Sequence, residues 1–139
     1  MIKKIYILTG LFVLVFFAGQ AIKAQEDVGR MLEDLEENTD RFAESFDNAL
    51  DNSEINGTSR EGEATRFVHD FEDSIDRLKK VWKTDKDARI AAQDSLTRAK
   101  AIDAVMRQYK FDEKAQTDWK TVKVNIELIA RVFKVEVEW

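Results

Sequence analysis

The sequence predicts an all-α fold: an antiparallel up-down four-helix bundle with a short extended C-terminal tail. Its 139 residues include no proline and only five glycines, so few positions interrupt a helix. Four stretches carry apolar residues at alternating spacings of four and three, which is the period of an amphipathic helix. The links between these stretches are short and favour antiparallel neighbours. A three-helix arrangement with a loosely attached first helix is the main alternative.

The N-terminal 24 residues differ in composition from the rest of the chain. Two lysines precede an apolar run over residues 5–18, and small residues follow shortly before Gln25. This layout is typical of a secretory signal peptide, with cleavage expected after Ala24 or, as an alternative, after Ala21. The apolar run is shorter than the roughly 20 residues that span a bilayer, which favours a cleaved signal over an uncleaved anchor.

Cleavage would leave one helical bundle domain, residues 25–139, in the periplasm or outside the cell. The signal peptide, residues 1–24, holds three lysines, so the formal charge of −5 for the whole chain becomes −8 for this domain. Such an acidic domain repels phosphate groups, which argues against nucleic acid or a membrane surface as a partner. The chain has no cysteine, and this excludes disulfides, Cys nucleophiles, zinc fingers and iron–sulfur sites.

The first two helices are separated by a turn. The first is predicted over residues 26–51, and its acidic residues lie opposite an apolar stripe. That stripe consists of Val28, Leu32, Leu35, Thr39, Phe42, Phe46 and Ala49. Asn56-Gly57 predicts the turn. Thr58 and Glu61 fit a capping box for the second helix, which is predicted over residues 59–82.

The third helix is predicted over residues 86–110 and the fourth over residues 113–133, with Asp112 as the N-cap of the fourth. Beyond this point the apolar period changes from 3.6 to two, which predicts an extended segment over residues 133–139. This tail either covers the bundle or remains an exposed strand that could add to a partner's sheet. Its candidate protein-contact residues are Val135, Val137 and Trp139.

His69 is the only histidine and could act as a metal ligand, a haem ligand or a general base. A transition-metal site usually combines several nitrogen or sulfur ligands, and the chain has no cysteine or second histidine to supply them. Haem bound by His69 and either Met31 or Met106 is a further alternative, although both methionines also fit core packing. We interpret His69 as a boundary residue paired with acidic neighbours.

Residues 52–63 weakly match the spacing of a calcium-binding EF-hand loop. Arg60 lies among the expected ligands and Ser59 occupies the apolar position, so we interpret the segment as a polar loop and expect no bound cofactor or metal. The weak candidate metal ligands of the whole chain are Asn52, Glu54, Asn56, Glu63 and His69.

No group of polar residues indicates an active site. The carboxylates of the first helix lie opposite its apolar stripe, and a nucleophile–base pair is lacking, so we expect no catalytic residue and no enzymatic activity. The leading hypothesis is an exported non-enzymatic helical-bundle protein that acts by protein–protein contact with an unidentified partner. Whether it forms a homo-oligomer is left open. The alternative is a periplasmic carrier or sensor that binds a ligand, haem or calcium.

Three stretches carry a resemblance to other proteins. They comprise residues 66–72 with 76–78, residues 98–103 with Met106, and Asp118-Trp119, Val122, Ile126, Ile129-Ala130 and residues 135–139. Through them the chain resembles a group of small secreted bacterial all-helical proteins that have no assigned function. The resemblance covers most of residues 25–139 and implies a helical exported domain. It brings no activity, cofactor or site residue with it.

Overall fold

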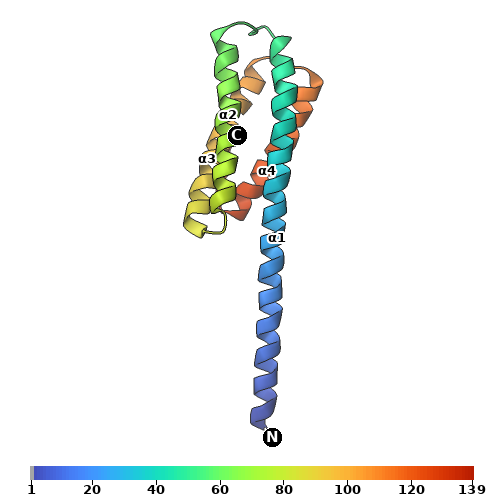
Figure 1. Cartoon of the computed structure of the whole chain (residues 1–139), viewed down its shortest axis with the longest axis vertical. Coiled ribbons are helices and arrows are strands. Elements are labelled where there is room, and N and C mark those ends of the chain that lie inside the picture. Colours follow the sequence, from blue (N-terminus) through green and yellow to red (C-terminus); the bar gives the residue numbers. More distant parts are fainter. Residues whose placement is uncertain (1) are drawn as a thin grey trace. The chain divides into compact units, whose positions relative to one another are not determined.

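A computed structural model describes the backbone of residues 2–139 and the side chains of residues 24–139. Its helices are α1 (Ile2–Asp51), α2 (Ser59–Val81), α3 (Asp85–Gln108) and α4 (Glu113–Val132). Figure 1 shows their succession along the chain, and the described residues form no strand. The all-α prediction is therefore confirmed.

The chain divides into two units, residues 1–30 and residues 31–139. Helix α1 starts at Ile2, whereas the apolar periodicity predicted a start near residue 26. The side chains of the predicted signal peptide lie outside the described residues up to position 23, so its cleavage stays a prediction. Among the described residues, no helix is long and apolar enough to cross a membrane.

Residues 31–139 form the predicted antiparallel four-helix bundle, in which neighbouring helices run up and down (Figure 1). Helix α1 lies against α4, where the Phe42 and Trp119 ring centroids are 4.9 Å apart. It also lies against α2, through an ion pair between Glu36 and Lys79. The residues of the apolar stripe predicted on α1 are buried from Leu32 to Ala49. The three-helix alternative is therefore wrong.

The predicted apolar stripes supply the core. Aromatic rings occupy its centre, where Phe42 stacks on Phe46 at 5.1 Å and the edge of Phe111 meets Phe46 at the same separation. The side chains buried on α4 are Ala115, Trp119, Val122, Ile126, Ile129 and Ala130. Large apolar side chains at heptad spacing thus bring the four helices together, because this burial removes their surface from water.

Two predicted helix caps have different outcomes. The carboxylate of Asp112 accepts a hydrogen bond from the Ala115 amide at 2.8 Å, so this N-cap is confirmed. The capping box before α2 is wrong in part: the Thr58 hydroxyl donates to the Ile55 carbonyl at 2.6 Å rather than capping the helix. Glu61 accepts from the Gly57 amide, one residue before the expected partner. The positive φ of 75° at Gly57 belongs to the tight turn at this position.

The C-terminus of α4 closes with a Schellman motif. The Val135 amide donates to the Ala130 carbonyl at 2.8 Å, and the Lys134 amide donates to the Arg131 carbonyl at 3.1 Å. This geometry places Lys134 in the left-handed region, with φ at 56°. Glycine is the usual residue here because it has no Cβ to strain the backbone. The motif turns the chain back toward the bundle, and Val135 is buried as a result.

Replacing Lys134 with glycine is expected to raise the free energy of unfolding by about 0.5–1 kcal/mol, because it relieves the left-handed strain. Urea denaturation followed by circular dichroism measures this change. Lys134→Ala is the matched control, since it removes the same charge and keeps the Cβ. Equal stabilisation by alanine and glycine would show that charge, and not backbone strain, limits stability at this position.

Candidate protein-contact groove between α1 and α2

His69 lies on the solvent side of α2 with 71% of its side chain exposed. Its Nδ1 is 3.2 Å from the Glu72 carboxylate, which agrees with a boundary histidine beside acidic neighbours. The two methionines considered as haem partners do not line the hollow at His69. Met106 is buried on α3, and Met31 is half-buried on α1.

The candidate calcium-loop residues make local contacts. The Asn52 amide donates to the Asn48 carbonyl at 2.9 Å and the Asn56 amide to the Asp51 carbonyl at 2.6 Å, so both satisfy carbonyl groups at the end of α1. Glu63 pairs with Arg60 at 3.0 Å, and Glu54 is exposed. In the part of the chain that the structure describes, no group of three His, Asp or Glu residues could hold a metal ion.

The C-terminal tail folds back along α4. The Trp139 indole donates to the Glu127 carboxylate at 2.6 Å, and its ring meets Trp119 edge-on with centroids 6.5 Å apart. The ammonium group of Lys123 lies 4.3 Å from the centroid of the Trp139 ring. Val135 is buried, whereas Val137 and Trp139 are half-buried. In this arrangement the tail covers the bundle, and Val135 is not accessible to a partner.

Replacing Trp139 with alanine is expected to lower the free energy of unfolding by about 1–2 kcal/mol. The variant loses the aromatic contact with Trp119, the cation–π contact with Lys123 and the hydrogen bond to Glu127. Thermal unfolding measures the loss. Trp139→Phe should recover most of it, because the phenyl ring retains the first two contacts. A Trp139→Ala protein as stable as the wild type would show that the tail is free in solution.

A buried carboxylate on α3 was not anticipated by the sequence. The side chain of Asp103 is 4% exposed, and its Oδ1 accepts hydrogen bonds from the Trp119 indole at 2.9 Å and from Lys123 Nζ. Its Oδ2 lies 3.0 Å from an Arg107 nitrogen. Two features of the sequence could have revealed this burial. Asp103 lies one helical turn after the core residue Ala99, and Trp119, in the apolar stripe of α4, has an indole N–H that needs an acceptor when buried. All its neighbours are structural partners, so Asp103 is a core anchor.

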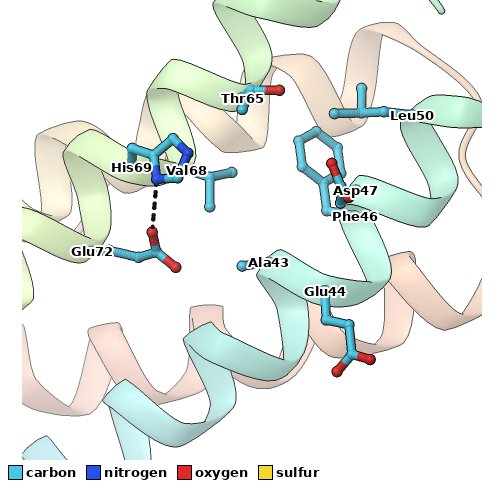
Figure 2. A pocket seen from close by; sticks show the side chains of 9 residues that line it. All are labelled: Ala43, Glu44, Phe46, Asp47, Leu50, Thr65, Val68, His69 and Glu72. Atoms are coloured by element: carbon cyan, nitrogen blue, oxygen red, sulfur yellow. Dashed lines mark ion pairs between the residues drawn. The ribbon is translucent and has the colours of Figure 1, made fainter.

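The hollow beside His69 is lined by side chains of α1 and α2 (Figure 2). Ala43, Phe46 and Leu50 of α1 and Val68 of α2 form its apolar floor, and its volume is about 320 Å³. The remaining lining residues are Glu44, Asp47, Thr65, His69 and Glu72. Figure 2 shows the His69–Glu72 pair at one margin of the hollow. The hollow thus combines an apolar floor with a polar, mainly acidic rim.

A second hollow continues along the same two helices and shares Glu72 with the first. It is lined by Glu36, Thr39, Asp40, Glu72, Ile75 and Asp76. We call the two together the α1–α2 groove. Its lining residues include six carboxylates and no lysine or arginine. Among the described ion pairs, one lysine contacts a carboxylate of this groove: Lys79, which pairs with Glu36.

The net negative charge of residues 31–139 lies on α1, the helix that forms one wall of this groove. Residues 31–51 of α1 hold eight carboxylates and one cation, Arg41, a formal charge of −7. Residues 52–139 hold 17 acidic and 17 basic side chains and are formally neutral. The pKa of Glu72 lies above its usual value, mainly because the carboxyl group is partly buried. The negative charges of Asp40 and Asp73 raise this pKa further, whereas His69 lowers it. A cation placed in the groove would relieve this repulsion.

Comparisons of the chain with family models, with curated proteins and with solved structures gave no match. The resemblance to small secreted helical proteins therefore stays an expectation. The chemistry of the α1–α2 groove is the feature from which a function can be argued.

Proposed function

We propose that this protein is an exported, non-enzymatic helical bundle that binds another polypeptide in the α1–α2 groove. The observation that carries the proposal is the apolar floor of Ala43, Phe46, Leu50 and Val68 beneath carboxylates that no lysine or arginine of the lining compensates. Thr65, His69 and Glu72 line the same hollow, but among the described hydrogen bonds none joins the Thr65 hydroxyl to His69, so we propose a binding role for the groove and not a catalytic one.

The composition of the groove specifies the partner's chemistry. Apolar side chains of a bound segment would fill the floor, in the manner of an amphipathic helix that lies in a groove. Lysine or arginine side chains of that segment would face the carboxylates, which steer association and set its orientation. The binding energy is then expected to come mainly from the apolar anchors, and the specificity from the charges.

The proposal predicts that charge reversal in the groove weakens partner binding by about tenfold or more. Glu44→Lys/Asp47→Lys changes two exposed rim residues, and neither takes part in an ion pair among the described residues. Glu54→Lys/Glu138→Lys is the matched control, because it changes the net charge equally at exposed positions away from the groove. Affinity pull-down with the tagged wild-type and variant proteins measures which polypeptides each of them retains from an extract of the producing cells. Retention that the groove change leaves undiminished, or that both double variants lose equally, would contradict the proposal.

Export is the second part of the proposal and is supported by the charged, apolar and small-residue pattern of residues 1–24. N-terminal sequencing of protein recovered from the envelope or the medium is expected to begin at Gln25, or at Ile22 if the alternative cleavage position is used. Protein that remains inside the cell with Met1 at its start would contradict export. The measurement is independent of partner binding.

A further inference from the structure

Helix α4 exposes a stripe of apolar side chains on its outer face. Val124 is 56% exposed, and Leu128 and Val132 are each 41% exposed. Their spacing of four places them on one side of the helix, over a length of about 12 Å. With Ile90 on α3, they are the large apolar side chains that the described residues leave exposed. Such a stripe costs free energy in water unless a partner covers it.

Cations flank this stripe on the same face of the helix. Lys120 precedes Val124 by about one turn, and Arg131 follows Val124 by seven residues, or about two turns; both are exposed. Lys120 takes part in no ion pair among the described residues, whereas Glu127 partly compensates the charge of Arg131. Glu127 accepts from Trp139 at 2.6 Å and lies 3.7 Å from Arg131, while Asp118 pairs with Lys114 at 2.9 Å. We call this face, from Lys120 to Val132, the basic α4 stripe.

We infer that the basic α4 stripe of one copy docks into the α1–α2 groove of a second copy. The inference rests on the proposed function and names its partner. The stripe has the two properties that the groove requires, namely apolar anchors at helical spacing and lysine or arginine beside them. The groove lining spans residues 36–50 of α1, or about 21 Å, and so accommodates the basic α4 stripe, which is about 18 Å long from Lys120 to Val132.

The two surfaces complement each other in charge. The groove contributes Glu44 and Asp47 at its exposed rim, and the stripe contributes Lys120 and Arg131. Because the groove and the stripe belong to different helices, two different surfaces meet in the contact. Such a heterologous contact produces a closed ring or an open chain of copies. Three anchors and a few charges imply weak assembly that depends on protein concentration and on salt.

Sedimentation velocity over a range of protein concentrations tests the inference. The protein is used as it is recovered from the cells that produce it. The wild type should assemble in about 0.1 M salt and dissociate in about 1 M salt, where the range of the charges shortens to roughly 3 Å. Glu44→Lys/Asp47→Lys and, separately, Lys120→Glu/Arg131→Glu should each weaken self-association by about tenfold or more. An equimolar mixture of these two variants should assemble again, because the reversed charges then face each other.

Two further variants separate docking from non-specific charge effects. Val124→Gln should weaken assembly with little change in the thermal midpoint, since Val124 is 56% exposed in the single copy. Glu54→Lys/Glu138→Lys should assemble like the wild type. A wild type that stays monomeric at every concentration, or assembly that neither double reversal alters, would overturn the inference. If the monomeric wild type still retains another polypeptide through Glu44 and Asp47, the proposed function stands without self-docking; if it retains none, both fail.

Discussion

Replacing Phe42 with alanine is expected to lower the free energy of unfolding by about 3–5 kcal/mol, the largest effect of any substitution considered for this protein. The Phe42 ring is fully buried and lies 5.1 Å from Phe46 and 4.9 Å from Trp119, so it joins α1 to α4 at the centre of the bundle. Truncation removes this contact and leaves a cavity that rigid neighbouring rings cannot fill. Urea denaturation with an unchanged m-value measures the loss.

Phe67→Ala is the matched control for Phe42→Ala. Phe67 is half-buried on α2 and lies under Arg66, whose guanidinium carbon is 5.9 Å from the ring centroid. Its truncation is expected to cost about 1 kcal/mol, because solvent already reaches the ring. Equal losses for the two variants would mean that α1 does not pack on α4 as the structure shows.

Replacing Asp103 with asparagine is expected to lower the free energy of unfolding by about 2–3 kcal/mol at neutral pH. The amide keeps an acceptor for the Trp119 indole and nearly the same volume, but it loses the charge that faces Lys123 and Arg107. Hydrogen bonds to a charged, buried acceptor are stronger than neutral ones. Asp118→Asn is the control and should cost under about 1 kcal/mol, because its partner Lys114 is largely exposed.

The effect of Asp103→Asn should also depend on pH. Burial raises the pKa of Asp103, but the hydrogen bonds from Trp119 and Lys123 and the nearby cations outweigh it and hold the pKa below the usual 3.8. A carboxyl group with a lowered pKa contributes stability above its unfolded pKa and loses it as pH falls through the folded value. The difference between wild type and variant is therefore expected to be constant above about pH 5 and to shrink below pH 3.8. A difference that persists undiminished in strong acid would contradict this role for the carboxylate.

The periodicity of the sequence was sufficient to predict the bundle and most of its core. Positions such as Leu35, Phe42 and Trp119 follow the heptad spacing, and burial of large apolar side chains decides how the helices pack. The Asp112 cap was predictable for a similar reason, because it depends on neighbouring residues only. Local sequence was a less certain guide before α2, where Thr58 has the residue type of an N-cap but its hydroxyl donates to the Ile55 carbonyl.

Features that depend on distances between helices were not accessible. The α1–α2 groove depends on how closely α1 and α2 approach each other, and the periodicity of the sequence does not report that spacing. The docking of Trp139 depends on the turn at Lys134, a residue that rarely adopts a left-handed conformation. The burial of Asp103 was not predicted because its partners, Trp119 and Lys123, belong to another helix.

Site-specific photocrosslinking tests most directly whether the α1–α2 groove is a protein-contact surface. A photoreactive residue replaces Thr65, which lines the groove, or Thr97, which is exposed on α3 and serves as the matched position. In producing cells, covalent adducts with a polypeptide are expected from position 65 and not from position 97. Adding Glu44→Lys/Asp47→Lys should remove them. Adducts of equal yield from both positions, or none from position 65, would contradict the assignment of this groove.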